Sequence, residues 1–186
     1  APKLLSEAVF DPPGNASPDL APAGDVLYVA SRFGLGVLDV KDPSALAWKG
    51  MIELPQKAAV TSVRAVGSHV LVTTNLFDYE GANNNNVTRL HVLDATDPLA
   101  PKLVWSSEDL GGAQYLTVVG DIAFVAAGGP SVKIFDLADI EHPVLEGSVE
   151  TPANVSFTAV GNNVLYAVLG AGGIQAIHTG PLPAMK

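Results

Sequence analysis

The feature that most constrains the fold of this chain is an internal repeat of about 42 residues. A glycine precedes each of four similar apolar runs, with spacings of 43, 53 and 41 residues, at Gly24, Gly67, Gly120 and Gly161. A polar residue closes a later run in each unit, with spacings of 55, 42 and 42 residues, at Asp39, Asp94, Asp136 and His178. Both markers place the extra residues of the second unit in one insert, LFDYEGANNNNV at 76–87.

Each unit contains four short segments that are rich in β-branched and aromatic residues and bounded by turn residues. In the third unit these segments cover residues 113–119, 122–128, 131–137 and 143–150. A unit of roughly 40 to 45 residues with four antiparallel strands is the period of a β-propeller blade. The sequence therefore predicts an all-β fold with about four four-stranded antiparallel blades, as part of a larger propeller.

Several third strands end in an aspartate that a proline soon follows, as in VLDVKDP at 37–43 and HVLDATDP at 91–98. Such an aspartate can accept a hydrogen bond from the backbone N–H two residues later, which forms an Asx-turn. The later proline cannot donate to a strand ladder, so the strand cannot continue through it. We therefore expect a structural turn that leads to an outer strand, and no catalytic or metal-binding role for these aspartates.

These units resemble the LVIVD repeat of bacterial β-propellers. In that family a glycine turn precedes a YAYVA-like strand, a GLVVLDVSDP-like strand and an NPVLVGSYDTP-like segment. This chain has GDVLYVA at 24–30, RLHVLDATDP at 89–98 and HPVLEGSVETP at 142–152, while the fourth unit departs with His178 in place of the aspartate. The resemblance implies a propeller in an extracellular, cell-surface or periplasmic location. It implies little about chemistry, because a fold does not fix a function.

The phase of the repeat divides the chain unevenly. The first residues, APKLLSEAVFD at 1–11, align with the outer-strand sequence APKLVWSSEDL at 100–110. The predicted units are an outer strand at 1–11, a first blade at 12–55 and a second blade at 56–110, which carries the insert 76–87. A third blade at 111–150 and a fourth blade at 151–186, which lacks its outer strand, follow. Either the first strand pairs with the last blade and closes a ring, or the chain is part of a longer propeller.

The charge distribution favours the second alternative. All 19 Asp and Glu residues lie within residues 1–150, and no Asp, Glu, Lys or Arg occurs from Thr151 to Met185. A terminal blade of this composition would expose an apolar face and an unpaired strand edge unless another element covered it. We therefore expect that further propeller blades or a protein partner cover residues 151–186, which makes the chain one component of a larger assembly.

Composition excludes several other classes of protein. The net charge is −9 and the ten Lys and Arg residues are scattered, so the chain lacks the basic face that nucleic-acid binding requires. Without cysteine there is no disulfide, no Cys-ligated zinc and no thiol nucleophile. The longest apolar runs are interrupted by GNN and GAGG, so no membrane span is expected.

The insert is the most distinctive candidate for binding. Phe77 and Tyr79 are aromatic side chains of a kind enriched at binding surfaces, and Asp78 and Glu80 alternate with them. Long loops on a rigid scaffold often carry function, so these four residues are the candidate binding residues. The carboxylates and the asparagines at 83–86 also offer oxygen ligands for Ca²⁺, although their spacing does not match an EF-hand loop. No other cofactor is expected.

The sequence contains no catalytic signature and no metal-ligand spacing. The four histidines lie at non-equivalent places in different units, at His69, His91, His142 and His178. Apart from small polar residues and a tyrosine, the inner-strand segments TSVRAV, QYLTVV and VSFTAV contribute one charge, Arg64. We therefore predict a non-catalytic protein-interaction or structural scaffold. The alternatives are a segment of a propeller enzyme, or a sugar- or peptide-binding propeller, whose site needs blades or domains outside this chain.

Overall fold

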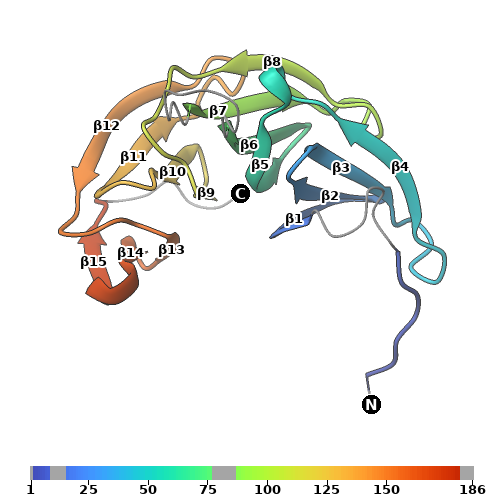
Figure 1. Ribbon diagram of the computed structural model, residues 1–186, viewed down its shortest axis with the longest axis horizontal. Helices are drawn as coiled ribbons and strands as arrows, with labels where there is room; N and C mark the ends of the chain where they lie inside the picture. The colour runs from blue at the N-terminus through green and yellow to red at the C-terminus, as the bar shows by residue number, and fades with distance from the viewer. Residues whose placement is uncertain (1, 9–15, 77–86, 181–186) are drawn as a thin grey trace, which may run out of the picture.

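A computed structural model of the chain describes residues 2–8, 16–76 and 87–180. These residues form four antiparallel sheets, each made of strands that are consecutive in the sequence (Figure 1). Blade 1 contains β1 (Ala16–Ala23), β2 (Val26–Ser31), β3 (Gly34–Asp39) and β4 (Ala47–Ile52). Blade 2 contains β5 (Ala59–Val66), β6 (His69–Leu76), β7 (Val87–Asp94) and β8 (Lys102–Ser106).

Blade 3 contains β9 (Tyr115–Val119), β10 (Ile122–Ala126), β11 (Ser131–Asp136) and β12 (Val144–Glu150). Blade 4 contains three strands, β13 (Phe157–Gly161), β14 (Val164–Val168) and β15 (Ile174–His178). Two short 3-10 segments, Pro55–Lys57 and Gly170–Gly172, complete the regular structure, and no described helix is long and apolar enough to cross a membrane. The predicted all-β fold of propeller blades is confirmed.

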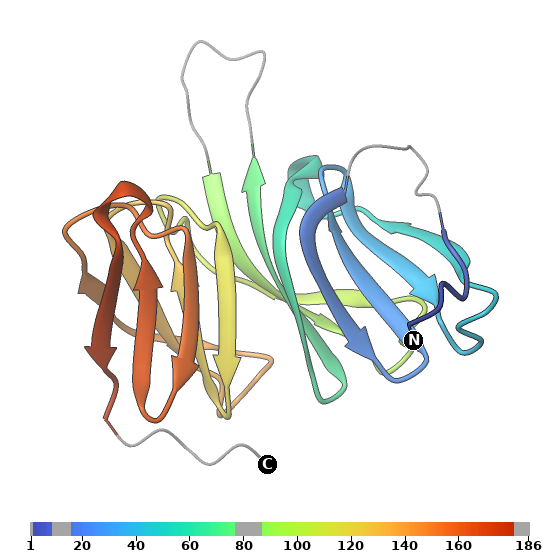
Figure 2. The ribbon, with the colours of Figure 1, turned by 90° about the horizontal axis from the view of Figure 1, so that it is seen from below.

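The blades lie side by side in an open arc (Figure 1). The first strand of each blade lies on the concave side, and β4, β8 and β12 lie on the convex side. Blades 1 and 4 form the two ends of the arc, with an opening between them (Figure 2). We call the face of a blade that points toward the following blade its trailing face, and the opposite face its leading face.

Residues 2–8 differ from the expectation of an outer strand over residues 1–11. They have no strand partner, and they run beside blade 1, at the opposite end of the arc from β15 (Figure 1). A strand forms only where another strand offers its edge. Closure of a ring within one chain is therefore not the arrangement in this structure.

The turns at the ends of the third strands form as predicted. The Oδ1 atoms of Asp39, Asp94 and Asp136 accept hydrogen bonds from the backbone N–H two residues later, at 3.1, 2.8 and 2.7 Å. In blade 4, Nδ1 of His178 accepts the equivalent bond from the N–H of Gly180 at 3.1 Å. The departure that the sequence shows at His178 therefore preserves the geometry of the turn.

These hydrogen bonds also lower the pKa of two of the aspartates. The backbone N–H of Lys41 is the main cause for Asp39, with help from the Lys49 side chain. For Asp94 the hydroxyl of Thr96 comes first, followed by the backbone N–H of the same residue. Both effects favour the ionised carboxylate, as a turn acceptor requires.

A hairpin turn that tolerates positive φ joins the first two strands of every blade. Gly24, Gly67 and Gly120 adopt φ of 59°, 58° and 57°, a conformation that glycine reaches without a steric penalty. Blade 4 uses Asn162 and Asn163 instead, with φ of 53° and 60°. Asparagine is the non-glycine residue best suited to such a turn, so the fourth hairpin keeps the same tight connection.

The hydrophobic core consists of three layers, one between each pair of neighbouring blades. Within a layer, aliphatic side chains on one blade's leading face pack against the previous blade's trailing face, because side chains alternate between the two faces of a strand. For example, Val70 and Val72 of blade 2 pack in the same cluster as Tyr28 of blade 1. The stability of each blade therefore depends on its neighbours.

Candidate functional site

One position in each blade indicates whether another blade follows. It is the residue of the second strand whose side chain lies on the trailing face, and the strand registers place it at Tyr28, Leu71, Phe124 and Tyr166. The first three side chains are 0%, 0% and 1% exposed, whereas Tyr166 is 42% exposed. The trailing face of blade 4 is therefore open.

The register of blade 4 assembles a continuous apolar surface from all three of its strands. Phe157 lies opposite Val168 and Val168 lies opposite Ile174, while Tyr166 lies between Ala159 and Ala176. We call this surface the blade 4 face: Phe157, Ala159, Tyr166, Val168, Ile174 and Ala176. Phe157 and Ile174 are 49% and 72% exposed, and none of the six residues is charged. A contiguous exposed apolar patch of this kind is typical of an interaction surface.

The edge of the same blade is also unpaired. In blades 1 to 3 the third strand pairs with an outer strand, but β15 pairs only with β14 in the part of the chain that the structure describes. Such an edge presents a row of N–H and C=O groups that another strand can use. Among the described residues, blade 4 therefore has no neighbour on its trailing face or along its outer edge.

A second feature lies on the concave side, where one side chain from each inner strand joins a continuous row. Asp19 Oδ2 lies 2.8 Å from Nη1 of Arg64, and the Arg64 guanidinium lies 4.8 Å from the ring centroid of Tyr115. The ring of Tyr115 meets Phe157 edge to face, with centroids 5.0 Å apart. We call these four residues the inner row. It connects all four blades and ends at the blade 4 face.

Asp19 holds the first two inner strands together. Besides the ion pair, it accepts hydrogen bonds from the N–H of Val63 at 3.0 Å and from the hydroxyl of Ser62. The sequence singled out Arg64 but gave no partner for it, because Asp19 lies 45 residues away in the chain. The available signal was an aspartate within an otherwise uncharged inner strand. An enzyme site on the concave side would need several charged side chains that point toward one another. On the described inner strands, the charged side chains are those of this single ion pair.

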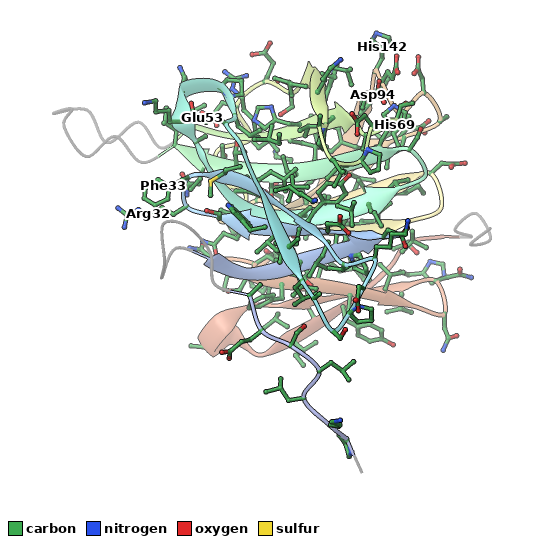
Figure 3. The ribbon with its side chains drawn as sticks, turned by 90° about the vertical axis from the view of Figure 1, so that its right-hand side faces the viewer. Arg32, Phe33, Glu53, His69, Asp94 and His142 are labelled. Carbon is green, nitrogen blue, oxygen red and sulfur yellow. The ribbon has the colours of Figure 1, made fainter. Side chains whose placement is uncertain are left out.

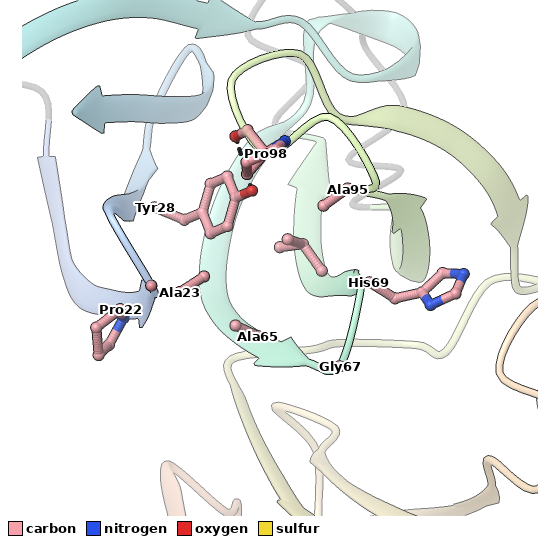
Figure 4. Close-up of a pocket in the computed structure, with 10 residues that line it drawn as sticks. Pro22, Ala23, Tyr28, Ala65, Gly67, His69, Ala95 and Pro98 are labelled. Carbon is pink, nitrogen blue, oxygen red and sulfur yellow. Dashed lines mark hydrogen bonds between the residues drawn. The ribbon is translucent and has the colours of Figure 1, made fainter. Parts of the chain in front are cut away.

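A groove of about 410 Å³ lies at the seam between blades 1 and 2 (Figure 4). On its rim the hydroxyl of Tyr28 donates a hydrogen bond to the carbonyl of Pro98 at 2.8 Å, so the turn of blade 2 holds the tyrosine of blade 1. Burial, with a smaller contribution from the charge of Asp97, raises the pKa of Tyr28 to about 12. The phenol therefore stays protonated and acts as a structural donor.

His69 and His142 both lie in structural contacts with carboxylates. His69 also lines the groove, but its Nε2 lies 3.4 Å from Oε1 of Glu141 in blade 3. His142 lies 3.1 Å from Asp139 at the same end of the molecule, the end opposite Arg32 and Phe33 (Figure 3).

His91 is buried between Thr74 Oγ1 at 3.0 Å and Ser106 Oγ at 2.8 Å. Burial, together with the charge of Arg89, lowers the pKa of His91 to about 4, so the ring is neutral at physiological pH. Among the described residues, no three His, Asp or Glu side chains gather as a metal site.

The binding residues predicted from the insert lie outside the described residues. Phe77, Asp78, Tyr79 and Glu80, and the asparagines at 83–86, belong to the connection between β6, which ends at Leu76, and β7, which begins at Val87. Their role in binding, and that of Ca²⁺, stay predictions.

Comparisons with known proteins agree with this architecture. The family model of the LVIVD repeat matches residues 13–53 and 110–151, which contain blades 1 and 3. A comparison with curated proteins gave no significant match. The computationally designed Ika4 protein has a similar structure, with a TM-score of 0.65 and 14% identity over 97% of this chain and 99% of that chain.

Two natural proteins also have similar structures. BamB from Moraxella catarrhalis aligns with a TM-score of 0.59 and 15% identity, over 86% of this chain and 45% of that chain. Glutaminyl cyclase from Myxococcus xanthus aligns with a TM-score of 0.54 and 13% identity, over 82% of this chain and 61% of that chain. At these identities the likeness concerns the fold alone, and this chain spans only part of the length of both natural proteins.

Proposed function

We propose that this chain, in which two segments match the LVIVD repeat and which has the fold of β-propeller blades, is a non-catalytic protein-interaction scaffold in an extracellular, cell-surface or periplasmic location. Its blade 4 face is the surface that another protein element covers, either further propeller blades or a separate protein partner. The chain thus acts as one component of a larger assembly. The inner row contributes rigidity to this scaffold by connecting the four inner strands.

The observation that carries the proposal is the exposure of Tyr166. Its three equivalents are buried by a following blade, and the same residue type at the same place in blade 1 is 0% exposed. Full burial of an exposed apolar side chain contributes about 1.5–3 kcal/mol, and the half-exposed Tyr166 and Phe157 would contribute part of that when a partner covers them. The absence of charge on residues 151–185 supports an apolar partner surface.

Light scattering coupled to size exclusion, together with binding of a dye that reports exposed apolar surface, tests the proposal. We expect the chain either to be larger than its 19.2 kDa monomer or, as a monomer, to bind the dye. Tyr166→Glu should diminish whichever property is seen, because it places a charge at the centre of the blade 4 face. Leu103→Glu is the matched control, since Leu103 is 40% exposed but lies on the outer strand of blade 2.

A monodisperse monomer that binds no dye would contradict the proposal, because the blade 4 face would then offer no apolar surface to a partner. Equal effects of the two substitutions would also contradict it, since the response would not be specific to blade 4.

A further inference from the structure

We propose that residues 2–8 of a second copy of this chain add to the free edge of β15 and become the outer strand of blade 4. This inference rests on the proposed function and names the partner that covers the blade. It makes the N-terminal segment a strand that is exchanged between copies.

The sequence of the N-terminal segment is that of an outer strand. Residues 1–5, APKLL, correspond to APKLV at 100–104, which leads into and forms the first half of β8. In the structure, however, residues 2–8 belong to no sheet, and Leu4 and Leu5 are 78% and 62% exposed. Their described polar contact is the hydroxyl of Ser6, which donates to the carbonyl of Pro43 at 2.7 Å. The segment thus has the composition of a strand but lacks a strand to pair with.

The free edge of β15 lacks the outer strand that the third strands of the other three blades have. In blade 2, Nδ1 of His91 lies 2.8 Å from Oγ of Ser106 on the outer strand. Gln175 occupies the position of His91 in blade 4, and its buried Oε1 has no hydrogen-bond partner among the described residues. A buried polar atom without a partner destabilises the fold, and a neighbouring strand can supply that partner. An added outer strand would bring polar groups to this place, as it does in blade 2.

The three existing outer strands predict the register of the added strand. Each joins its third strand with an irregularity at the same place in the blade, between Val37 and Leu38, Val92 and Leu93, and Ile134 and Phe135. Transfer of the blade 2 register to blade 4 places Lys3 opposite His178 and Leu4 opposite Ile177. It then places Ser6 opposite Ala176, with Leu5 at the bulge, and Glu7 opposite Gln175.

Chain connectivity explains why the same event covers the blade 4 face. In this fold each outer strand leads directly into the inner strand of the next blade, as β4 leads into β5 and β8 into β9. Residues 2–8 lead into β1 in the same way. If residues 2–8 of one copy complete blade 4 of another copy, blade 1 of the first copy follows directly after them. The leading face of that blade 1, which includes the half-buried Leu27 and Trp48, is then placed against the blade 4 face of the other copy. A second identical contact closes a two-fold ring from two open arcs.

Disulfide trapping tests this arrangement directly, because the natural chain contains no cysteine. A Ser6→Cys copy is mixed with an Ala176→Cys copy under mild oxidation. We expect a disulfide-linked pair of chains, since the register places these residues opposite each other. The matched control is a mixture of Ser6→Cys with Ile174→Cys, which lies on the same face of β15 but two residues away. Two residues along a strand span more than a disulfide can bridge, so its yield should be lower by about tenfold.

A second variant separates this inference from the proposed function. Deletion of residues 1–8 should give a folded monomer, because the described part of that segment belongs to no sheet. Equal cross-linking of the test and control mixtures would overturn the inference. The inference would also be overturned if the chain without residues 1–8 still formed an oligomer and only Tyr166→Glu abolished it. That result would leave the proposed function standing. A monomer that binds no apolar dye would overturn both.

Discussion

Tyr28 and Tyr166 are the same residue type at the same place in two blades, but their side chains differ in exposure. Tyr28 is fully buried, and its hydroxyl is fixed by the carbonyl of Pro98 in the next blade. Tyr166 is 42% exposed on a blade that no described blade follows. The difference lies in the neighbour and not in the residue, because a following blade covers Tyr28 and no described blade covers Tyr166.

The leading face of blade 1, at the other end of the arc, is less exposed than the blade 4 face. On the leading face of blade 1, Val29 and Leu38 are 5% and 2% exposed, although no described blade precedes them. Trp48 contributes to this cover, because its ring lies over Gly36, where a Cβ atom would come within 2.8 Å of it. Blade 1 therefore covers its own strands with an aromatic ring. The blade 4 face has no such cover among the described residues.

The largest expected effect is that of truncating Tyr28, measured against the same truncation of Tyr166. Tyr28→Ala should lower the free energy of unfolding by about 3–5 kcal/mol, because it leaves a cavity between blades 1 and 2. Tyr166→Ala should cost under about 1 kcal/mol when the chain is kept monomeric by dilution, since little burial is lost. Urea unfolding of both variants at one low protein concentration measures the difference. Similar losses would show that Tyr166 is already covered in the monomer.

A smaller effect should follow from titration of His91, whose counterpart in blade 4 is Gln175. The pKa of His91 is lowered to about 4 in the folded state, below its ordinary 6.5, so the unfolded chain binds the proton more readily. Its contribution is therefore fully present above pH 6.5 and is lost as the pH falls toward 4, to a limit of about 3 kcal/mol. His91→Gln, which copies blade 4, should flatten the pH dependence of urea unfolding over that interval. An unchanged slope would contradict the assignment.

The smallest of the three effects concerns the inner row, which links the well-packed end of the molecule to the open one. Arg64→Ala should lower the free energy of unfolding by about 1–2 kcal/mol, because it leaves the partly buried carboxylate of Asp19 without its cation. Asp19→Asn should cost less, since the amide oxygen can still accept from Val63. A double-mutant cycle measures the coupling, and additive losses would mean that the ion pair does not stabilise the fold.

Much of the fold followed from local pattern. The repeat of glycine turns and strand-ending polar residues predicted the blades, and the hydrogen bonds of Asp39, Asp94 and Asp136 confirm the predicted turns. These features could be read from the sequence because each depends on residues only a few positions apart. The uncharged stretch after Thr151 likewise pointed to blade 4 as the surface in need of a partner.

Other features required the tertiary structure. The residues directly beside Tyr28 and Tyr166, VLYVA and VLYAV, do not distinguish the two, and nothing local joins Asp19 to Arg64. Both outcomes depend on strands that are distant in sequence and adjacent in space. Residues 2–8 resemble the outer strand β8 in sequence yet form no strand, and blade 4, the blade without an outer strand, lies at the other end of the arc. The sequence by itself determined what each blade is. Only the tertiary structure decided which blades have neighbours. Burial requires two surfaces in contact, and the sequence of one segment specifies only one of those surfaces.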